Sequence, residues 1–145
     1  MRNTIIIVLL SLLALYTLYE RSDWFFKQAG QEQAASIDQL KHAFENKISN
    51  LQVEGSGVVK AILKDDTKGS KHQRIIVDLS SGQSILVVHN IDLAPRVENI
   101  NRGDVIAFFG EYEWNDKGGV IHWTHHDPRN KHVAGWLKHN GRTYR

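Results

Sequence analysis

The fold is decided between residues 72 and 90, which read HQRIIVDLSSGQSILVVHN. Before the turn, residues alternate between the two faces of a strand: Gln73, Ile75, Val77 and Leu79 share one face, and His72, Arg74, Ile76 and Asp78 share the other. The run 84–91 is apolar on both faces and predicts a second strand. Between them, Ser-Ser-Gly-Gln at 80–83 has the composition of a hairpin turn. The stretch therefore predicts an antiparallel hairpin within a β domain.

Three further stretches have strand-like composition, which gives five predicted strands: 53–63, 72–79, 84–91, 104–114 and 119–125. A second turn at 115–119 joins the last two strands. The longer connection 92–103 contains Pro95 and has room for a short helix. Asn140-Gly141 favours a type I′ turn and predicts an extra hairpin over 139–145.

This arrangement predicts an all-β fold class, a small five-stranded OB-like barrel. Hairpins join strands two to three and four to five, and the long connection lies between strands three and four. An immunoglobulin-like sandwich would need about seven strands. The side chains that we expect in the barrel core are Ile75, Val77, Val87, Phe108, Ile121 and Trp123.

The composition is that of one globular domain. The chain has 145 residues, 41% hydrophobic and 23% charged, so it can form one modest core. A formal net charge of +2 is too small to indicate a nucleic-acid or membrane-surface partner by itself. The absence of cysteine excludes disulfides, thiolate zinc sites and cysteine nucleophiles.

An uncharged apolar run extends from Thr4 to Tyr19. As a helix it spans about 24 Å, between a signal-peptide core and a short membrane-spanning helix. No small-residue cleavage pattern follows directly, and Trp24 lies where an aromatic ring favours the membrane interface. We therefore expect residues 1–21 to be an uncleaved anchor, with a cleaved signal segment as the alternative. Arg2 precedes the run, so the rest of the chain is expected outside the cytoplasm.

Residues 22–51 predict a linker that ends in a short amphipathic helix. Ser36 and Gln39 fit a capping box, and apolar residues recur at three- and four-residue steps from 37 to 51. A dimerising stalk is one interpretation. A helix packed on the following β domain, residues 52–145, is preferred, because two heptads are too few for a coiled coil.

Four motifs carry a resemblance to a known family: DD…G…HQ at 65–73, HNIDLAPR at 89–96, GEYEWN at 110–115 and GVIHWTHHDP at 119–128. Over about residues 44–144 the chain resembles an uncharacterised bacterial family known only as a domain of unknown function. The resemblance implies a small exported or anchored protein of Gram-negative type bacteria, and it implies no activity. With the anchor, it predicts a protein held in the inner membrane whose domain faces the periplasm, or a secreted one if the segment is cleaved.

Histidines are concentrated near the C-terminus, where five of the eight fall between positions 122 and 139. The candidate metal ligands are His122, His125, His126, Asp127 and His132, whose side chains suit zinc or another borderline metal. In a continuous strand His122 and His126 would lie about 13 Å apart. The set can converge only if the strand ends near His125 and the chain bends before Pro128. A divalent metal such as zinc is therefore one hypothesis, and individually placed structural histidines are the other.

A second set marks the candidate ligand-binding face of the OB-like fold: His72, Arg74, His89, Asp92 and Trp114. In that fold the loops at 64–71 and 115–119 flank the ligand. Lysines in these loops, with Trp114 for stacking, would suit nucleic acid, but aspartates in the same loops oppose that charge. His89 lies among apolar residues, so a buried, hydrogen-bonded side chain is the preferred interpretation for it.

Glu111 and Glu113 share one face of a strand, about 7 Å apart. That spacing would allow paired carboxylate chemistry or metal binding. A solvent-facing acidic edge is the preferred interpretation.

The sequence leaves more than one function open. The first is a membrane-anchored, extracytoplasmic OB-like binding module of unknown ligand. The alternative is a metal-dependent hydrolase, phosphodiesterase- or nuclease-like, in which the 122–132 cluster activates water. A third is a structural partner protein whose histidines respond to pH. No nucleophile elbow, phosphate loop or dinucleotide fingerprint is present, so no catalytic residue is assigned.

Overall fold

The computed structural model describes residues 2–145, with side chains from Ile5 onward. Met1, the first residue of the predicted anchor, and the side chain of Arg2, on which the predicted orientation depends, lie outside this description. The chain divides into two compact units, one that ends at Ala34 and one from Ala35 to Arg145.

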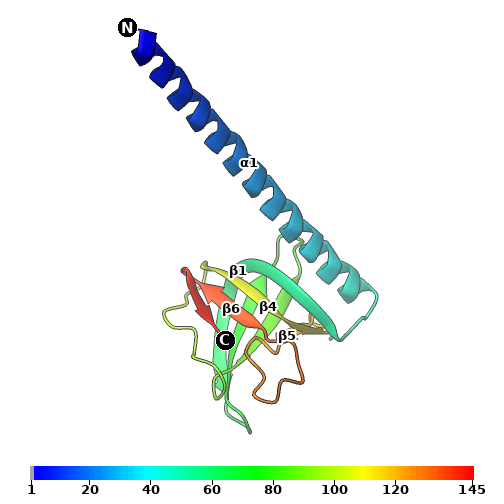
Figure 1. Ribbon diagram of the computed structural model, residues 1–145. Helices are drawn as coiled ribbons and strands as arrows, with labels where there is room; N and C mark the ends of the chain where they lie inside the picture. The colour runs from blue at the N-terminus through cyan, green and yellow to red at the C-terminus, as the bar shows by residue number, and fades with distance from the viewer. Residues whose placement is uncertain (1) are drawn as a thin grey trace. The chain divides into compact units, whose positions relative to one another are not determined.

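One continuous helix, α1 (Arg2–Glu45), covers both the predicted anchor and the predicted amphipathic helix, which the sequence treated as separate elements (Figure 1). The capping box at Ser36 is therefore wrong as a helix start. No proline interrupts the preceding residues, so their amides keep intrahelical partners and need no cap. The Ser36 hydroxyl instead donates to the backbone carbonyl of Glu54.

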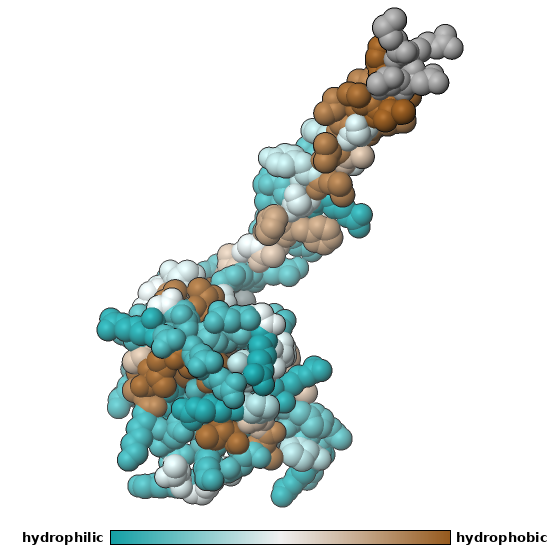
Figure 2. Space-filling model, turned by 90° about the vertical axis from the view of Figure 1, so that its left-hand side faces the viewer, coloured by the Kyte–Doolittle hydropathy of each residue, from teal (hydrophilic) through white to brown (hydrophobic). Residues whose placement is uncertain are grey.

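The first unit exposes a long apolar surface. Side chains from Ile5 to Tyr19 lie on the surface of the helix, and the large apolar ones are each at least 50% exposed. Figure 2 shows these apolar side chains over the part of α1 nearest the N-terminus. Within the described residues, α1 is the one helix that is long and apolar enough to cross a membrane.

The second unit consists of the end of α1 and seven strands. They are β1 (Leu51–Asp66), β2 (His72–Asp78), β3 (Ser84–Asn90), β4 (Val105–Glu113), β5 (Val120–His122), β6 (Trp136–His139) and β7 (Arg142–Tyr144). The five strands predicted from the sequence correspond to β1–β5, and the predicted C-terminal hairpin is β6–β7 around Asn140-Gly141. The connection between β3 and β4 contains turns and no helix.

Five strands pair in a ring. The order is β1–β2–β3–β5–β4, and β4 pairs with β1 again to complete it. All of these pairings are antiparallel except β3–β5, where Leu86 and Val87 pair in parallel with Val120 and Ile121. The hairpin β6–β7 extends the sheet beyond the ring, because β6 pairs with the first part of β4, from Ile106 to Phe109.

Strand β1 takes part in two pairings because it bends. Its first half, from Leu51 to Val58, pairs with β4, and its second half pairs with β2 across two irregularities in register. Gly55 and Gly57 lie in the first half. A Cβ at Gly55 would come within 2.8 Å of the Phe108 ring, and one at Gly57 within 2.5 Å of the Asp78 carbonyl oxygen. The two glycines therefore permit the close approach that the ring requires.

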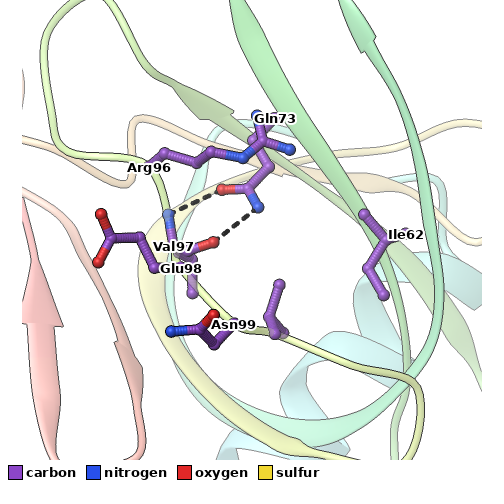
Figure 3. A pocket seen from close by; sticks show the side chains of 7 residues that line it. Ile62, Gln73, Arg96, Val97, Glu98 and Asn99 are labelled. Carbon is purple, nitrogen blue, oxygen red and sulfur yellow. Dashed lines mark hydrogen bonds between the residues drawn. The ribbon is translucent and has the colours of Figure 1, made fainter.

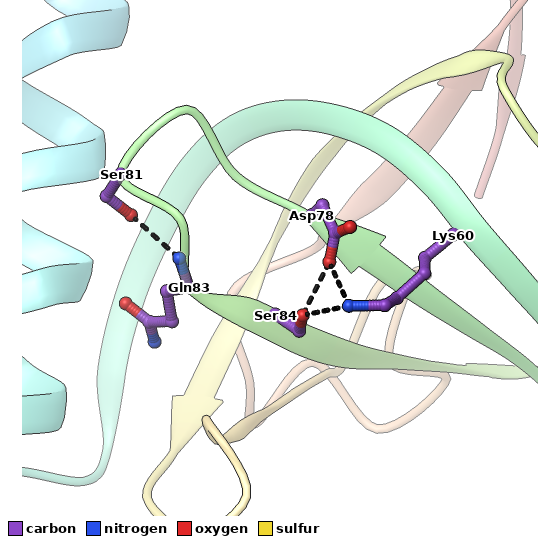
Figure 4. A network of polar contacts seen from close by, with 5 residues as sticks. All are labelled: Lys60, Asp78, Ser81, Gln83 and Ser84. Carbon is purple, nitrogen blue, oxygen red and sulfur yellow. Dashed lines mark hydrogen bonds and ion pairs between the residues drawn. The ribbon is translucent and has the colours of Figure 1, made fainter.

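A polar network lies on the outer face where β1, β2 and β3 meet (Figure 4). Lys60 Nζ lies 3.1 Å from Asp78 Oδ1 and 3.0 Å from Ser84 Oγ, and the Ser84 hydroxyl donates to the same carboxylate. The hydrogen bond from Ser84, followed by that from Lys60, lowers the pKa of Asp78. The network joins three strands through one carboxylate.

A buried amide holds the connection between β3 and β4 against the sheet (Figure 3). The Gln73 side chain donates to the carbonyl of Val97 at 3.0 Å and accepts from its backbone N–H at 2.9 Å. Both residues are 1% exposed. These two bonds satisfy the backbone N–H and carbonyl of Val97, which lies in a segment that pairs with no strand.

The core lies inside the ring and against the end of α1. Five of the six predicted core side chains, Ile75, Val77, Val87, Phe108 and Ile121, are fully buried. Trp123 is not, so its prediction as a core residue is wrong. Strand β5 ends at His122, and the in–out alternation on which that prediction relied stops there.

Leu40 connects α1 to the β domain, since it is fully buried in the core cluster. Replacing Leu40 with alanine should lower the free energy of unfolding by about 2–5 kcal/mol, because a cavity is left in the core. Urea unfolding of the full chain in detergent micelles, followed by far-UV circular dichroism, measures the change. Lys41→Ala, at an exposed neighbouring position, should change it little. Equal effects of the two variants would contradict a core position for this face of the helix.

Candidate functional site

The chain turns abruptly after β5, at Trp123. Its φ of 53° is in the left-handed region, which a bulky side chain adopts at a cost of about 1–2 kcal/mol. The segment that follows is closed by a hydrogen bond of 3.1 Å from the Gly135 N–H to the His125 carbonyl. A Cβ at Gly135 would lie 2.0 Å from the carbonyl oxygen of Trp123, so only glycine fits there. Strained conformations of this kind cluster at functional sites.

Three imidazoles surround the Trp123 ring. His132 stacks on it with a centroid distance of 3.7 Å and an interplanar angle of 13°. His125 and His122 lie at centroid distances of 5.4 Å and 6.3 Å. Three of the five predicted metal ligands are thus gathered around one aromatic ring.

Two surface hollows share Trp123 and Leu93. The first, which we call the histidine hollow, has a volume of about 290 Å³ and is lined by His72, Val88, Asn90, Leu93, His122, Trp123 and His125. The second has a volume of about 550 Å³ and is lined by Leu93, Trp123, Asp127, Pro128, Arg129, Lys131 and His132. The strained turn at Trp123 therefore separates two open spaces.

A carboxylate lies between two of these imidazoles. Glu111 Oε1 is 3.5 Å from His122 Nε2, and Glu111 Oε2 is 3.9 Å from His132 Nδ1. Glu113 lies two residues along the same strand, and donor atoms of Glu111, Glu113 and His122 all lie within 4.8 Å of one another. Among the described residues, this is the one group of three or more such side chains with that spacing.

The remaining predicted metal ligands make other contacts. His125 Nδ1 lies 2.8 Å from the carbonyl of His126, and the His126 side chain is exposed. Asp127 accepts backbone N–H groups of Arg129, Lys131 and His132 at 3.0, 2.8 and 3.1 Å. These bonds, with that from Arg129 first, lower the pKa of Asp127. Asp127 thus organises its own loop, as turn aspartates do.

The predicted ligand-binding residues lie in different surroundings. His72 lines the histidine hollow, but Asp92 accepts the Lys71 N–H at 2.8 Å and Arg74 donates to the Lys64 carbonyl at 3.0 Å. Trp114 donates its ring N–H to the Phe44 carbonyl at 2.9 Å, at the end of α1. An indole held in this way gives the nucleic-acid interpretation no support.

His89 is the fully buried member of that set. Its Nδ1 lies 2.8 Å from Thr124 Oγ1, and its Nε2 lies 3.1 Å from the Pro95 carbonyl. Burial lowers the pKa of His89 to about 4, although the bond to Pro95 acts in the opposite direction. The side chain is therefore neutral at pH 7 and joins β3 to two connecting segments.

Sequence reasoning named neither Asn90 nor Leu93 as a site residue, and it treated Glu111 and Glu113 as an acidic edge. The turn at 115–119 is the sequence feature that could have identified the two glutamates as site residues. In an antiparallel hairpin with that turn, Glu111 pairs with His122 and Glu113 with Val120. Extending the register would have placed a histidine beside the acidic pair.

Comparison with known proteins identifies one family. The family model described as "Protein of unknown function (DUF3465)" matches residues 25–145. No curated protein matches the sequence.

The low pKa of His89 predicts a loss of stability in acid. The unfolded chain binds a proton near pH 6.5 and the folded chain only near pH 4, so stability falls as the pH drops through this interval. Between pH 7.5 and 4.5 the loss from this residue should be about 2–3 kcal/mol. Unfolding by urea at both pH values should show a smaller loss for His89→Gln, and carbon-13 NMR should show a ring that stays neutral at pH 5. A His89 ring that titrates near pH 6.5 in the folded chain would contradict this.

Proposed function

Because this chain belongs to the DUF3465 family, whose function is unknown, we propose a function from its own residues. It is a membrane-anchored protein that holds an OB-like β-barrel binding module outside the cytoplasm. The observation that carries the proposal is the combination of an unpacked apolar helix with a compact β unit that has a histidine- and tryptophan-lined hollow.

The polar groups of the apolar run support the anchor. Ser11 and Thr17 interrupt the run, and their hydroxyls donate to the carbonyls of Val8 and Ala14 at 2.9 and 2.8 Å. Hydroxyls satisfied within their own helix are compatible with hydrocarbon, where no water replaces a missing partner. The hydroxyls of Ser11 and Thr17 therefore do not oppose insertion of the apolar run.

The residues after the run support an interfacial position. Trp24 and Phe25 form an edge-on aromatic pair with centroids 5.1 Å apart, and Arg21 lies over the Phe25 ring. Aromatic rings with adjacent charges favour the level of the lipid headgroups. Arg2 and the amino terminus precede the run, and this positive charge favours retention of the N-terminus in the cytoplasm.

The strand order supports an OB-like barrel. Closure of a five-stranded sheet through β1–β4, with β3 beside β5, is the pairing that such a small barrel requires. The outward side chains of β2, β3 and β5, among them His72, Asn90 and His122, line the histidine hollow. Binding on that face agrees with the way OB folds present ligands.

The ligand of the hollow is a small polar molecule. His72, His125 and Asn90 provide hydrogen-bonding groups, and Val88 and Leu93 provide apolar walls. Concave sites of a few hundred Å³ with a few convergent polar groups are the usual form of small-molecule sites. The hydrolase alternative needs a metal, and its proposed site at 122–132 uses Asp127, whose oxygens are already occupied by backbone N–H groups.

The anchor predicts both location and orientation. Replacing Leu9 with arginine should release most of the protein from the membrane fraction, because a charge in the middle of a short apolar helix costs about 2.5–3.5 kcal/mol in insertion. Carbonate extraction measures this, and Gln31→Arg, beyond the apolar run, is the control. A C-terminal alkaline phosphatase fusion should be active. A mature chain that begins after Tyr19, or an inactive fusion, would contradict the anchor or its orientation.

The hollow predicts where small polar molecules bind. A fragment library of carboxylates, amides and sugars should shift the NMR ring signals of His72 and His125 and leave those of His42, an exposed residue of α1, unchanged. Asn90→Leu should remove most of these shifts. Fragments that act equally on His42, or that bind only in the hollow beside Gln73 and Arg96 (Figure 3), would contradict the proposed ligand site.

A further inference from the structure

We propose that Glu111, Glu113 and His122 bind one divalent transition-metal ion, with zinc as the first candidate. The backbone assembles this site from two strands. Glu111 and Glu113 are separated by one residue on β4 and share its outer face, and His122 on β5 is the cross-strand partner of Glu111. Three potential ligands are thus fixed by strand register, which is a rigid support for a metal site.

The distance between donor atoms suits an ion better than a hydrogen bond. His122 Nε2 and Glu111 Oε1 are 3.5 Å apart, whereas charge-assisted hydrogen bonds are about 2.7–2.9 Å long. Two ligands bound at about 2.1 Å to a tetrahedral zinc ion are about 3.4 Å apart. The observed separation is therefore close to that of two ligands of one ion.

The atoms at this site lack other partners. His122 Nε2 is shielded from solvent and has no hydrogen-bond partner among the described residues. No lysine or arginine among the described residues forms an ion pair with Glu111 or Glu113. Two neighbouring carboxylates without a cation favour the binding of one.

His132 has an orienting role at this site. Its Nδ1 lies 3.9 Å from the second oxygen of Glu111, and its ring is fixed by stacking on Trp123. At 3.9 Å this is not a hydrogen bond, but a small movement of the Glu111 carboxylate would let His132 bond one oxygen while the other faces the ion, as second-shell groups do. Three protein ligands leave a fourth position for water or for an oxygen of a bound molecule. His122 also lines the histidine hollow, so this position can be shared with a ligand there.

Zinc titration of the tag-free full chain in detergent micelles tests the proposal. The wild type should bind about one zinc ion per chain at pH 7.5 by calorimetry, and binding should raise the melting temperature. Glu113→Gln and His122→Ala should weaken zinc binding at least tenfold, since loss of even an outer-shell partner typically costs 10–100-fold. Their metal-free circular dichroism should match the wild type.

His126→Ala is the matched control, because His126 is exposed and belongs only to the site predicted from the sequence. It should bind zinc as the wild type does, and zinc should shift the NMR ring signals of His122 but not those of His42. Absence of binding and of any melting shift with zinc or manganese would overturn the proposal. So would an equal loss of affinity in His126→Ala, or a Glu113→Gln variant that folds and binds zinc normally. The membrane and fragment experiments above are independent of these outcomes.

Discussion

The ring of strands depends on the pairing of β1 with two neighbours at once. Its first half hydrogen-bonds to β4 and its second half to β2. This double use is sterically permitted because Gly55 leaves space for the Phe108 ring and Gly57 leaves space for the Asp78 carbonyl. The buried apolar side chains of the strands, from Val53 to Tyr144, belong to one core cluster, and the ring that this contact closes surrounds most of it.

Local chemistry was sufficient to predict most of the sheet. The alternation at Ile75 and Val77, the glycine turns and Asn140-Gly141 each act within a few residues, and each gave the observed strand or turn. Two features were missed because they depend on where a neighbouring element begins or ends. The helix passes through Ser36 because its preceding turns are already stable, and Trp123 leaves the core because β5 ends one residue earlier.

The candidate site was only partly accessible from sequence, for a related reason. The histidines after β5 were recognised by their density, but their grouping follows from the left-handed turn at Trp123 and the close packing of Gly135. Linear spacing favoured Asp127 as a ligand, whereas loop geometry uses its oxygens for backbone N–H groups. Glu111 lies beside His122 because the two residues are cross-strand partners. The hairpin turn at 115–119 implies this pairing, whereas the composition of the two strands does not.

The parallel pair β3–β5 also determines when the domain can acquire its structure. The hairpin β2–β3 can form alone. In contrast, Val87 can pair with β5 only once Ile121 has been synthesised, and Leu51 can pair with β4 only once Tyr112 has been synthesised. Closure of such non-local contacts is slow, because long loops lose entropy before any contact compensates for it. The ring of strands can therefore close only late in synthesis, after β5 has left the ribosome. An open chain that persists until synthesis is nearly complete would suit the proposed placement of the domain outside the cytoplasm, because a domain that has not yet folded can be moved across a membrane.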